Sequence, residues 1–230
     1  MTRLFITGTG TGIGKTFVTA ALAHAALEAG RSVMALKPVL SGFDAGDWRA
    51  SDTGVLLEAQ RLALTPENLG RISPFRFAAP LSPDMAAARE GRSISLDAVL
   101  AHCRAAIASP AEVVLIEGVG GVCVPLNGTQ TVLDWIGALG IPAVLVAGSY
   151  LGTISHTLTA LSVLGQAGAN VRAVVISESA GPPVPLAETA ATIGRFAGDT
   201  PVFQIPRAGT ENGWRHAGGL TPLLGLRRKP

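Results

Sequence analysis

Residues 7–16 carry the pattern with the clearest chemistry, Thr-Gly-Thr-Gly-Thr-Gly-Ile-Gly-Lys-Thr, between an apolar run at 4–6 and a helix-like run at 17–22. Closely spaced glycines let backbone N–H groups approach phosphate oxygens, and the N-terminus of the following helix adds partial positive charge. In such a loop Lys15 would reach the β- and γ-phosphates, and the Thr16 hydroxyl would bind Mg²⁺. The segment therefore predicts a phosphate-binding loop for a nucleoside triphosphate.

The spacing of this loop leaves a second interpretation to weigh. The usual phosphate loop places four residues between its first glycine and Gly-Lys-Ser/Thr, and here the nearest first glycine, Gly8, is one residue too far. The glycines also fit the dinucleotide turn of short-chain dehydrogenases, which need a Tyr-x-x-x-Lys pair for proton transfer. Tyr150 is the only tyrosine, and Ile154 stands four residues after it. The dehydrogenase reading therefore lacks its catalytic pair.

A lysine follows the second apolar run of the chain. Lys37 comes directly after residues 33–36, and Pro38 with the Ser41-Gly42 pair indicates a fixed loop. A lysine in this place would add positive charge opposite the γ-phosphate. We therefore favour a functional Lys37 over a solvated surface lysine.

Two acidic residues are candidates for the Mg²⁺ site. Glu117 ends the apolar run 113–116 and is followed by Gly118 and Gly120, which resembles the acidic metal partner of a phosphate loop. Mg²⁺ bound to a nucleotide typically takes one or two carboxylates and keeps several waters. Asp52 precedes an apolar helical stretch, so either a metal-binding role or a helix cap formed by Asp52 or Ser51 is open.

The surrounding pattern indicates how these residues are positioned. Short apolar runs alternate with Ala/Leu-rich helical stretches, which predicts a mostly parallel sheet with helices on both faces, a three-layer α/β fold of the P-loop NTPase type. The expected strands are 4–6, 33–36, 113–116, 143–147 and 171–176, and the expected helices are 17–29, 96–108, 154–167 and 186–197. In such sheets ligands bind outside the carboxyl ends of the strands. No linker or repeat divides the chain, so we expect a single domain over 1–230.

Composition excludes several classes of function. The formal net charge is +2 with 5% aromatic residues, which does not indicate a nucleic-acid surface. No apolar stretch reaches membrane-spanning length, and the chain opens on a strand with no leader-like segment. Two cysteines, Cys103 and Cys123, are too few for a disulfide framework. We expect a cytoplasmic protein with neither nucleic-acid nor membrane partners.

Five motifs taken in order resemble those of the dethiobiotin synthetases, and the resemblance spans most of the chain. They are Gly-Thr-x-Thr-x-Ile-Gly-Lys-Thr at 8–16, Lys-Pro-Val-x-Ser-Gly at 37–42, Ser-Asp at 51–52, Glu-Gly-x-Gly-Gly at 117–121 and Leu-Gly-x-x-x-His at 151–156. The lengthened phosphate loop is that family's own form. The resemblance implies a homodimeric enzyme that closes a cyclic urea on 7,8-diaminononanoate with CO₂, ATP and Mg²⁺, a step of biotin biosynthesis.

The resemblance also implies roles for individual residues. Lys15, Lys37 and Thr11 would be catalytic, and Thr16, Asp52 and Glu117 would hold Mg²⁺. The nucleotide would contact Gly12, Ile13, Gly14, Lys15, Thr16, Phe17, Asp52, Glu117, Gly118, Gly120, Ser177, Ile205, Pro206 and Arg207. The substrate would contact Thr11, Lys37 and Ser41, and also Leu151, Gly152 and Thr153 of the second subunit.

The chain departs from the family pattern at three positions. Gly10 stands where many members carry Asp, and Ser155 replaces an Asn often found before His156. Ser177 stands where an Asn commonly reads the adenine edge, and one hydroxyl cannot replace a bidentate amide. Another nucleoside triphosphate could therefore serve in place of ATP.

The main alternative is a switch ATPase like ParA or MinD. Those proteins typically carry an additional lysine near the start of the loop, where this chain has Gly8 to Gly10. MinD-like proteins also need a basic amphipathic membrane helix, and the segment 220–229 is short and interrupted by proline. The synthetase interpretation is therefore favoured.

Overall fold

The protein is built on one parallel sheet of six strands. The computed structural model describes residues 1–208 and 212–225, and its main sheet has the strand order β2-β5-β1-β6-β7-β8, with every neighbouring pair parallel. These strands are β1 (Thr2–Gly8), β2 (Val33–Leu36), β5 (Val113–Glu117), β6 (Ala143–Ala147), β7 (Val171–Ser177) and β8 (Val202–Ile205). Two short strands, β3 (Val39–Ser41) and β4 (Phe75–Phe77), pair separately. Because all strands of the main sheet run the same way, the residues that follow them gather at one edge.

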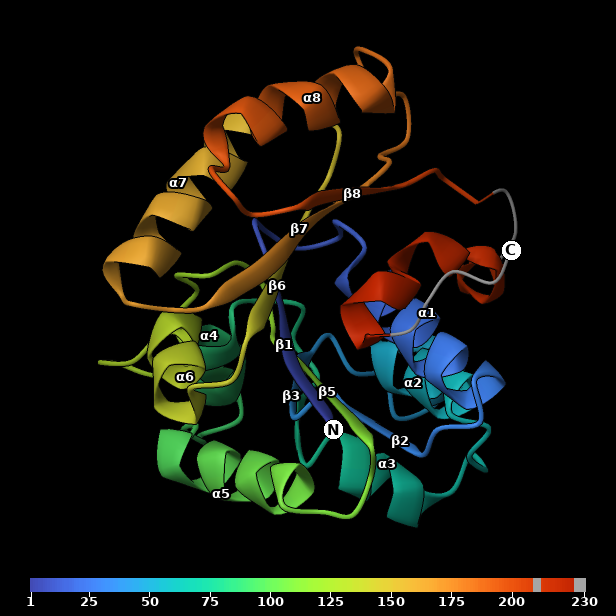
Figure 1. Cartoon of the computed structure of the whole chain (residues 1–230). Helices are drawn as coiled ribbons and strands as arrows, with labels where there is room; N and C mark the ends of the chain where they lie inside the picture. The colour runs from blue at the N-terminus through green and yellow to red at the C-terminus, as the bar shows by residue number, and fades with distance from the viewer. Residues whose placement is uncertain (209–211, 226–230) are drawn as a thin grey trace.

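Helices cover both faces of the sheet, as Figure 1 shows. Helix α1 lies on one face beside α2 and the 3₁₀ segments within residues 213–224, whereas α5, α6 and α7 lie on the other and α8 packs beside α7. The helices are α1 (Lys15–Glu28), α2 (Asp52–Ala59), α3 (Pro66–Ile72), α4 (Pro83–Arg89), α5 (Leu96–Ile107), α6 (Val132–Leu139), α7 (Thr153–Gln166) and α8 (Leu186–Phe196). Three 3₁₀ segments complete the described residues: η1 (Trp48–Ala50), η2 (Gly213–His216) and η3 (Gly218–Leu224). The predicted three-layer α/β fold is confirmed.

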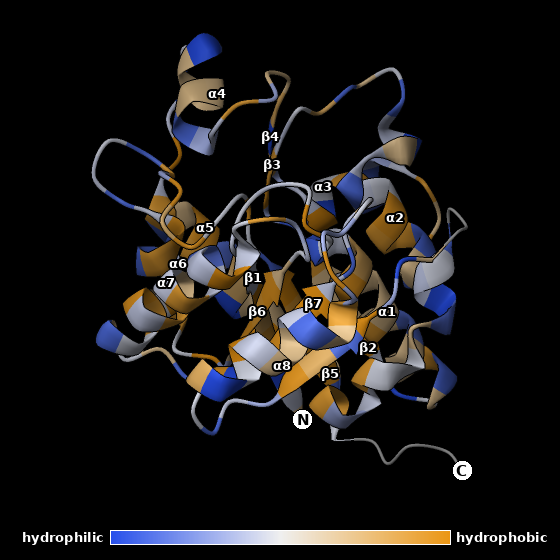
Figure 2. Cartoon of the chain, turned by 90° about the horizontal axis from the view of Figure 1, so that it is seen from above, coloured by the Kyte–Doolittle hydropathy of each residue, from blue (hydrophilic) through white to orange (hydrophobic). Residues whose placement is uncertain are grey.

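The sheet is apolar because both of its faces are covered. Strands β5 and β6 are buried along their whole length, and β1 is buried from Leu4 onward. Viewed along the perpendicular direction in Figure 2, the strands form an apolar centre, and the hydrophilic residues lie on the outer helices and loops. A continuous apolar run is the pattern expected of a parallel strand covered on two sides. Over the described residues, no helix combines the length and apolar character that crossing a membrane requires.

The sequence patterns found five of the six strands of the main sheet and missed β8. That strand is only four residues long, lies at the edge of the sheet between Pro201 and Pro206, and includes exposed Gln204. The small sheet of β3 and β4 was also not predicted, because three-residue strands give no measurable alternation. Both matter for the site, since β8 ends beside β7 and the small sheet holds a loop over the carboxyl edge.

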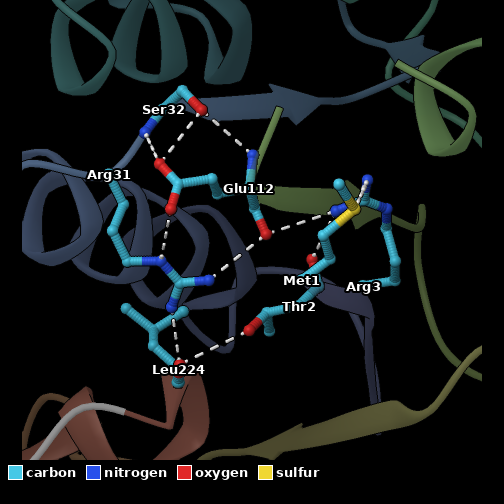
Figure 3. A network of polar contacts seen from close by, with 7 residues as sticks. All are labelled: Met1, Thr2, Arg3, Arg31, Ser32, Glu112 and Leu224. Carbon is cyan, nitrogen blue, oxygen red and sulfur yellow. Dashed lines mark hydrogen bonds and ion pairs between the residues drawn. The ribbon is translucent and has the colours of Figure 1, made fainter. Parts of the chain in front are cut away.

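A polar network fixes the opposite edge of the sheet (Figure 3). The carbonyl of Leu224 accepts hydrogen bonds from Arg31 Nη1 at 2.8 Å and from Thr2 Oγ1 at 3.4 Å. The Glu112 carboxylate accepts bonds from the backbone and the hydroxyl of Ser32 and faces Arg31 at 3.7 Å. The network therefore ties the end of η3 to the start of β1 and to the turn before β2.

We predict that the contact between Phe5 and Trp135 is a major source of stability. Their rings meet edge to face with centroids 5.0 Å apart, and both residues are fully buried between β1 and α6. Trp135→Ala should lower the free energy of unfolding by about 3–5 kcal/mol, because it leaves a large cavity in a close-packed core. Urea denaturation followed by circular dichroism measures this change.

The matched control is Phe196→Ala, which removes an aromatic side chain that is 66% exposed on α8. Its effect should stay within about 0.5 kcal/mol. Equal losses for the two variants would show that burial against Phe5 is not what makes Trp135 important.

Candidate functional site

The glycine-rich loop connects β1 to α1, and its backbone conformation favours glycine at two positions. Gly12 has φ 71° and Gly14, the N-cap of α1, has φ 98°, a left-handed backbone that side chains with a Cβ rarely adopt. A Cβ on Gly8 would lie 2.6 Å from Ile13 Cδ1 and 3.1 Å from the Val146 carbonyl oxygen. The loop thus packs closely on β6 and presents the N-terminus of α1 toward the carboxyl edge, an arrangement suited to phosphate.

Lys15 is the first residue of α1, and its side chain is buried within the loop. Its Nζ donates to the Gly10 carbonyl at 2.5 Å. Burial, with a contribution from the positive charge of Lys37, lowers the pKa of Lys15 to about 8. An added polyphosphate would restore an opposite charge to this ammonium group, so the loop is poised to bind an anion.

Four further polar side chains meet beside Lys15. The Nζ of Lys37 lies 2.6 Å from Glu117 Oε1 and 2.7 Å from Asp52 Oδ2, and the Thr16 hydroxyl donates to the same Glu117 oxygen at 2.7 Å. The side chains of Lys37 and Glu117 are 5% and 0% exposed, whereas that of Asp52 is 39% exposed. The structure thus brings together four residues that sequence analysis assigned to the site.

The charges in this cluster stabilise one another. Burial alone would lower the pKa of Lys37, but the carboxylates of Glu117 and Asp52 outweigh burial and raise it. Burial would raise the pKa of Asp52, but Lys37, together with the Thr16 hydroxyl and the charge of Lys15, outweighs burial and lowers it. Burial raises the pKa of Glu117, and Lys37 offsets part of that increase. Lys37 is therefore held as a charged ammonium group at neutral pH.

The donor set fits Mg²⁺. Glu117 Oε2 is buried and finds no hydrogen-bond partner among the described residues, and with Asp52 and the Thr16 hydroxyl it offers hard oxygen ligands from three elements. Within residues 1–208 and 212–225, no three His, Cys, Asp or Glu side chains cluster as a closed metal site. Two carboxylates and a hydroxyl suit a metal that keeps waters and shares phosphate oxygens. Asp52 is the first residue of α2, but the N-cap of that helix is Ser51, whose hydroxyl accepts a hydrogen bond from the Gly54 N–H. The Asp52 carboxylate is therefore not needed as the helix cap.

A cavity of about 710 Å³ opens above this cluster. Its lining includes the predicted residues Thr11, Gly12, Gly14, Lys15, Thr16, Lys37, Ser41, Asp52 and Gly120. Sequence analysis missed the rest of the lining, which is formed by Leu40, Pro80, Leu81, Ser82, Pro83, Val119 and Val124. The β3–β4 pair holds the loop 78–83 in place, because the Gly42 N–H donates to the Ala79 carbonyl and that of Phe43 to the Phe77 carbonyl. The two prolines within residues 80–83 mark a loop but carry no chemistry that would have identified it.

A second cavity of about 370 Å³ adjoins the first on the far side of the loop. It is lined by Gly12, Ile13, Gly14, Phe17, Ser177, Glu178, Ser179, Ala180, Pro206, Arg207 and Ala208. Ile205, which was also predicted, is buried at the end of β8 and contributes its carbonyl to the Glu178 N–H. Glu178 itself was missed, since nothing before or after it in the sequence marks it. The phosphate loop therefore lines this cavity as well as the larger one.

Two predicted groups lie elsewhere. Gly118 packs under the loop, where a Cβ would lie 3.0 Å from the Phe5 ring. Leu151 is 87% exposed and Gly152 is also exposed, and neither lines the two cavities described above. Thr153 is buried and donates to the Gly148 carbonyl. The expected partner-subunit role of these residues stays a prediction.

Comparison with known proteins places this site in context. A family model described as an AAA domain matches residues 2–211. A protein of Methylobacterium nodulans named ATP-dependent dethiobiotin synthetase BioD is 53% identical over 86% of this chain and 90% of its own length. Proteins of the same name from Phenylobacterium zucineum and Caulobacter vibrioides are 47% and 44% identical, over 100% and 97% of this chain and 97% and 99% of their own lengths.

Solved structures with the same fold are more distant in sequence. The MinC:MinD cell division protein complex of Aquifex aeolicus has a TM-score of 0.56 at 11% identity, covering 96% of this chain and 88% of that one. The signal recognition particle receptor FtsY of Elizabethkingia anophelis has a TM-score of 0.51 at 16% identity, covering 97% and 64%. At these identities the likeness concerns the fold alone, so it gives the switch-ATPase alternative no support beyond the fold.

We predict that Lys37→Met destabilises the protein in a pH-dependent way. The substitution leaves the fully buried Glu117 carboxylate without its cation, which at pH 8 should cost about 3–5 kcal/mol in the free energy of unfolding. Because burial then raises the pKa of Glu117 further, the folded state takes up a proton more readily than the unfolded state as the pH falls. The difference from the unmodified protein should therefore shrink at pH 5.5.

Denaturant titrations of both proteins at the two pH values measure this difference. Adding Glu117→Gln to Lys37→Met should restore most of the lost stability, since the buried charge is then removed. A loss that is the same at pH 8 and pH 5.5 would contradict the prediction.

Proposed function

The chain belongs to the ATP-dependent dethiobiotin synthetase family, and we propose that it forms dethiobiotin from 7,8-diaminononanoate, CO₂ and ATP. The observation that carries this proposal is the identity of 47% with a synthetase over the whole chain, combined with the cluster of Lys15, Lys37, Asp52 and Glu117 beside the phosphate loop. The enzyme is accordingly a cyclo-ligase of biotin biosynthesis.

We propose that the triphosphate lies on the N-terminus of α1, where backbone N–H groups and Lys15 face its oxygens. Thr16, Asp52 and Glu117 would hold Mg²⁺, which when bound supplies charge neutralisation at the β- and γ-phosphates. The 710 Å³ cavity contains the reacting groups, and the 370 Å³ cavity beside it takes the base. Ser177, Pro206 and Arg207 line the base cavity.

The proposed chemistry balances in three steps. One amine of the diamine adds to CO₂ and loses a proton, giving a carbamate. A carbamate oxygen then attacks the γ-phosphorus and the bond to the bridging oxygen of ADP breaks, giving a carbamic–phosphoric anhydride. The second amine attacks the carbamate carbon, inorganic phosphate leaves, and loss of a proton completes the cyclic urea.

The protein would contribute position and charge. Thr11 and Ser41 are proposed to orient the carbamate, since both line the larger cavity together with Lys15 and Lys37. Lys15 and Lys37 are proposed to stabilise the negative charge that spreads over the carbamate and the transferring phosphoryl group. A charged Lys37 suits this role, because its ammonium group is already buried and held between the carboxylates of Asp52 and Glu117.

We further propose a homodimer in the cytoplasm. Leu151 exposes a large apolar side chain next to Gly152 at the start of α7, and such a residue suits a contact with a second copy of the chain. In this arrangement Leu151, Gly152 and Thr153 of one subunit would lie along the apolar tail of the diamine bound to the other.

The proposal is tested by phosphate release from MgATP with and without 7,8-diaminononanoate and bicarbonate. Release should depend on the diamine and match the dethiobiotin formed. Lys37→Ala and Lys37→Arg should each lower kcat by roughly 100-fold or more, because even the longer guanidinium places its charge differently. The Kd for MgATP should change by less than about fivefold.

Lys37→Arg keeps a cation between Asp52 and Glu117, so it separates the loss of chemistry from a loss of stability. Unchanged turnover in both variants would remove Lys37 from the mechanism. A rate of ATP hydrolysis that does not depend on the diamine but rises with DNA or lipid vesicles would favour a switch ATPase over the synthetase.

We predict that Leu151→Glu shifts the protein toward monomers and raises the KM for the diamine by about tenfold or more, because it places a charge in an apolar contact. Light scattering after size-exclusion chromatography measures the mass, and steady-state kinetics measures the KM. Phe196→Glu, which alters another exposed apolar residue on α8, is the control and should change neither. A monomer with an unaltered KM would refute the shared site.

A further inference from the structure

The carboxylate of Glu178 is fixed on the wall of the smaller cavity. Glu178 follows β7, its backbone N–H donates to the Ile205 carbonyl at 2.9 Å, and its Oε2 accepts from the Arg207 N–H at 2.8 Å. Both bonds tie it to the end of β8 and the segment after it. Within the described residues the second oxygen, Oε1, accepts no hydrogen bond, so it is available to a molecule in the cavity.

Of the two neighbouring hydroxyl groups, that of Ser179 accepts a hydrogen bond within the protein and that of Ser177 lies against the phosphate loop. A Cβ on Gly14 would lie only 2.5 Å from Ser177 Oγ, so this side chain packs directly against the phosphate loop. Ser179 Oγ accepts from the Ser149 N–H at 3.0 Å, and the Ser179 N–H donates to Ser149 Oγ at 2.9 Å. Glu178 is therefore the side chain of this wall best placed to read the edge of a base.

An ionised carboxylate accepts hydrogen bonds and donates none. Guanine offers two adjacent donors, N1–H and the 2-amino group, which match the two-oxygen geometry of a carboxylate or one of its oxygens. Adenine and cytosine offer one exocyclic amino group each. Uracil offers N3–H flanked by two carbonyl oxygens, which a carboxylate repels.

We infer that Glu178 selects the base, so that the enzyme uses GTP as well as ATP, takes CTP, and discriminates against UTP. The inference rests on the proposed function, because it treats the 370 Å³ cavity beside the phosphate loop as the base site. In this inference the carboxylate of Glu178 takes the base-reading role that the family pattern gives to an Asn at the position of Ser177. Arg207 holds that carboxylate through its backbone N–H, so the selectivity does not depend on the exposed Arg207 side chain.

The test measures the Kd of the Mg²⁺ complexes of ATP, GTP, CTP and UTP by calorimetry, on the full chain without the diamine. The unmodified protein should bind GTP within about tenfold of ATP and UTP at least about tenfold more weakly. Glu178→Gln keeps the size of the side chain and an oxygen for the Arg207 N–H, but it presents an amide. In this variant the Kd for GTP should rise by about tenfold or more. The Kd for UTP should fall, because its O4 can accept a hydrogen bond from the new NH₂ group.

Opposite shifts for GTP and UTP separate base reading from a general loss of structure. Glu188→Gln, on the first turn of α8, is the matched control and should leave all four Kd values unchanged. Rejection of GTP by the unmodified protein, or equal shifts of all four nucleotides in Glu178→Gln, would overturn the inference. Failure to form dethiobiotin with any nucleotide would overturn the proposed function instead, and the order of the Kd values would still decide the role of Glu178.

Discussion

The ion pair between Lys37 and Glu117 is the interaction on which the site depends, and the register of the sheet produces it. Strands β2 and β5 are parallel neighbours with Leu36 opposite Ile116, so the next residue of each strand falls beside the other. A carboxylate removed from water is tolerated only with a cation and hydrogen bonds around it. Lys37 supplies the cation and the Thr16 hydroxyl supplies a hydrogen bond from the first turn of α1. The charges are therefore a consequence of strand order as much as of local sequence.

The phosphate loop divides the site into two regions with different constraints. The charged residues that line the larger cavity are Lys15 in α1, Lys37 after β2 and Asp52 in α2, whereas the smaller cavity draws most of its lining from Ser177 at the end of β7 and from residues that follow β7 and β8. Among the described residues, only Gly12 and Gly14 of this loop line both cavities. The groups proposed for bond making can thus stay constant while the groups that face the base vary, as the serine at position 177 illustrates.

The sequence predicted what depends on local pattern and missed what depends on tertiary placement. Apolar runs located five strands of the main sheet, and the rule that ligands lie at carboxyl ends joined Lys15, Lys37 and Glu117 correctly in space. The wall at 80–83 was invisible, because it is positioned by a three-residue strand pair and not by its own side chains. Glu178 was missed for a similar reason: its relevance comes from the Arg207 N–H on the next strand's loop.

The central position of β1 has a consequence for folding during synthesis on the ribosome. The first strand to emerge pairs with β5 and β6, where Thr2 meets Val113 and Phe5 meets Ala143. At elongation rates of about 5–20 residues per second those partners follow on the order of ten seconds later. The bond from Thr2 to Leu224 has to wait for almost the whole chain. The nascent polypeptide thus carries an unpaired apolar strand through most of translation, a natural client for chaperones, and it gains the capacity to bind nucleotide only near the end of synthesis.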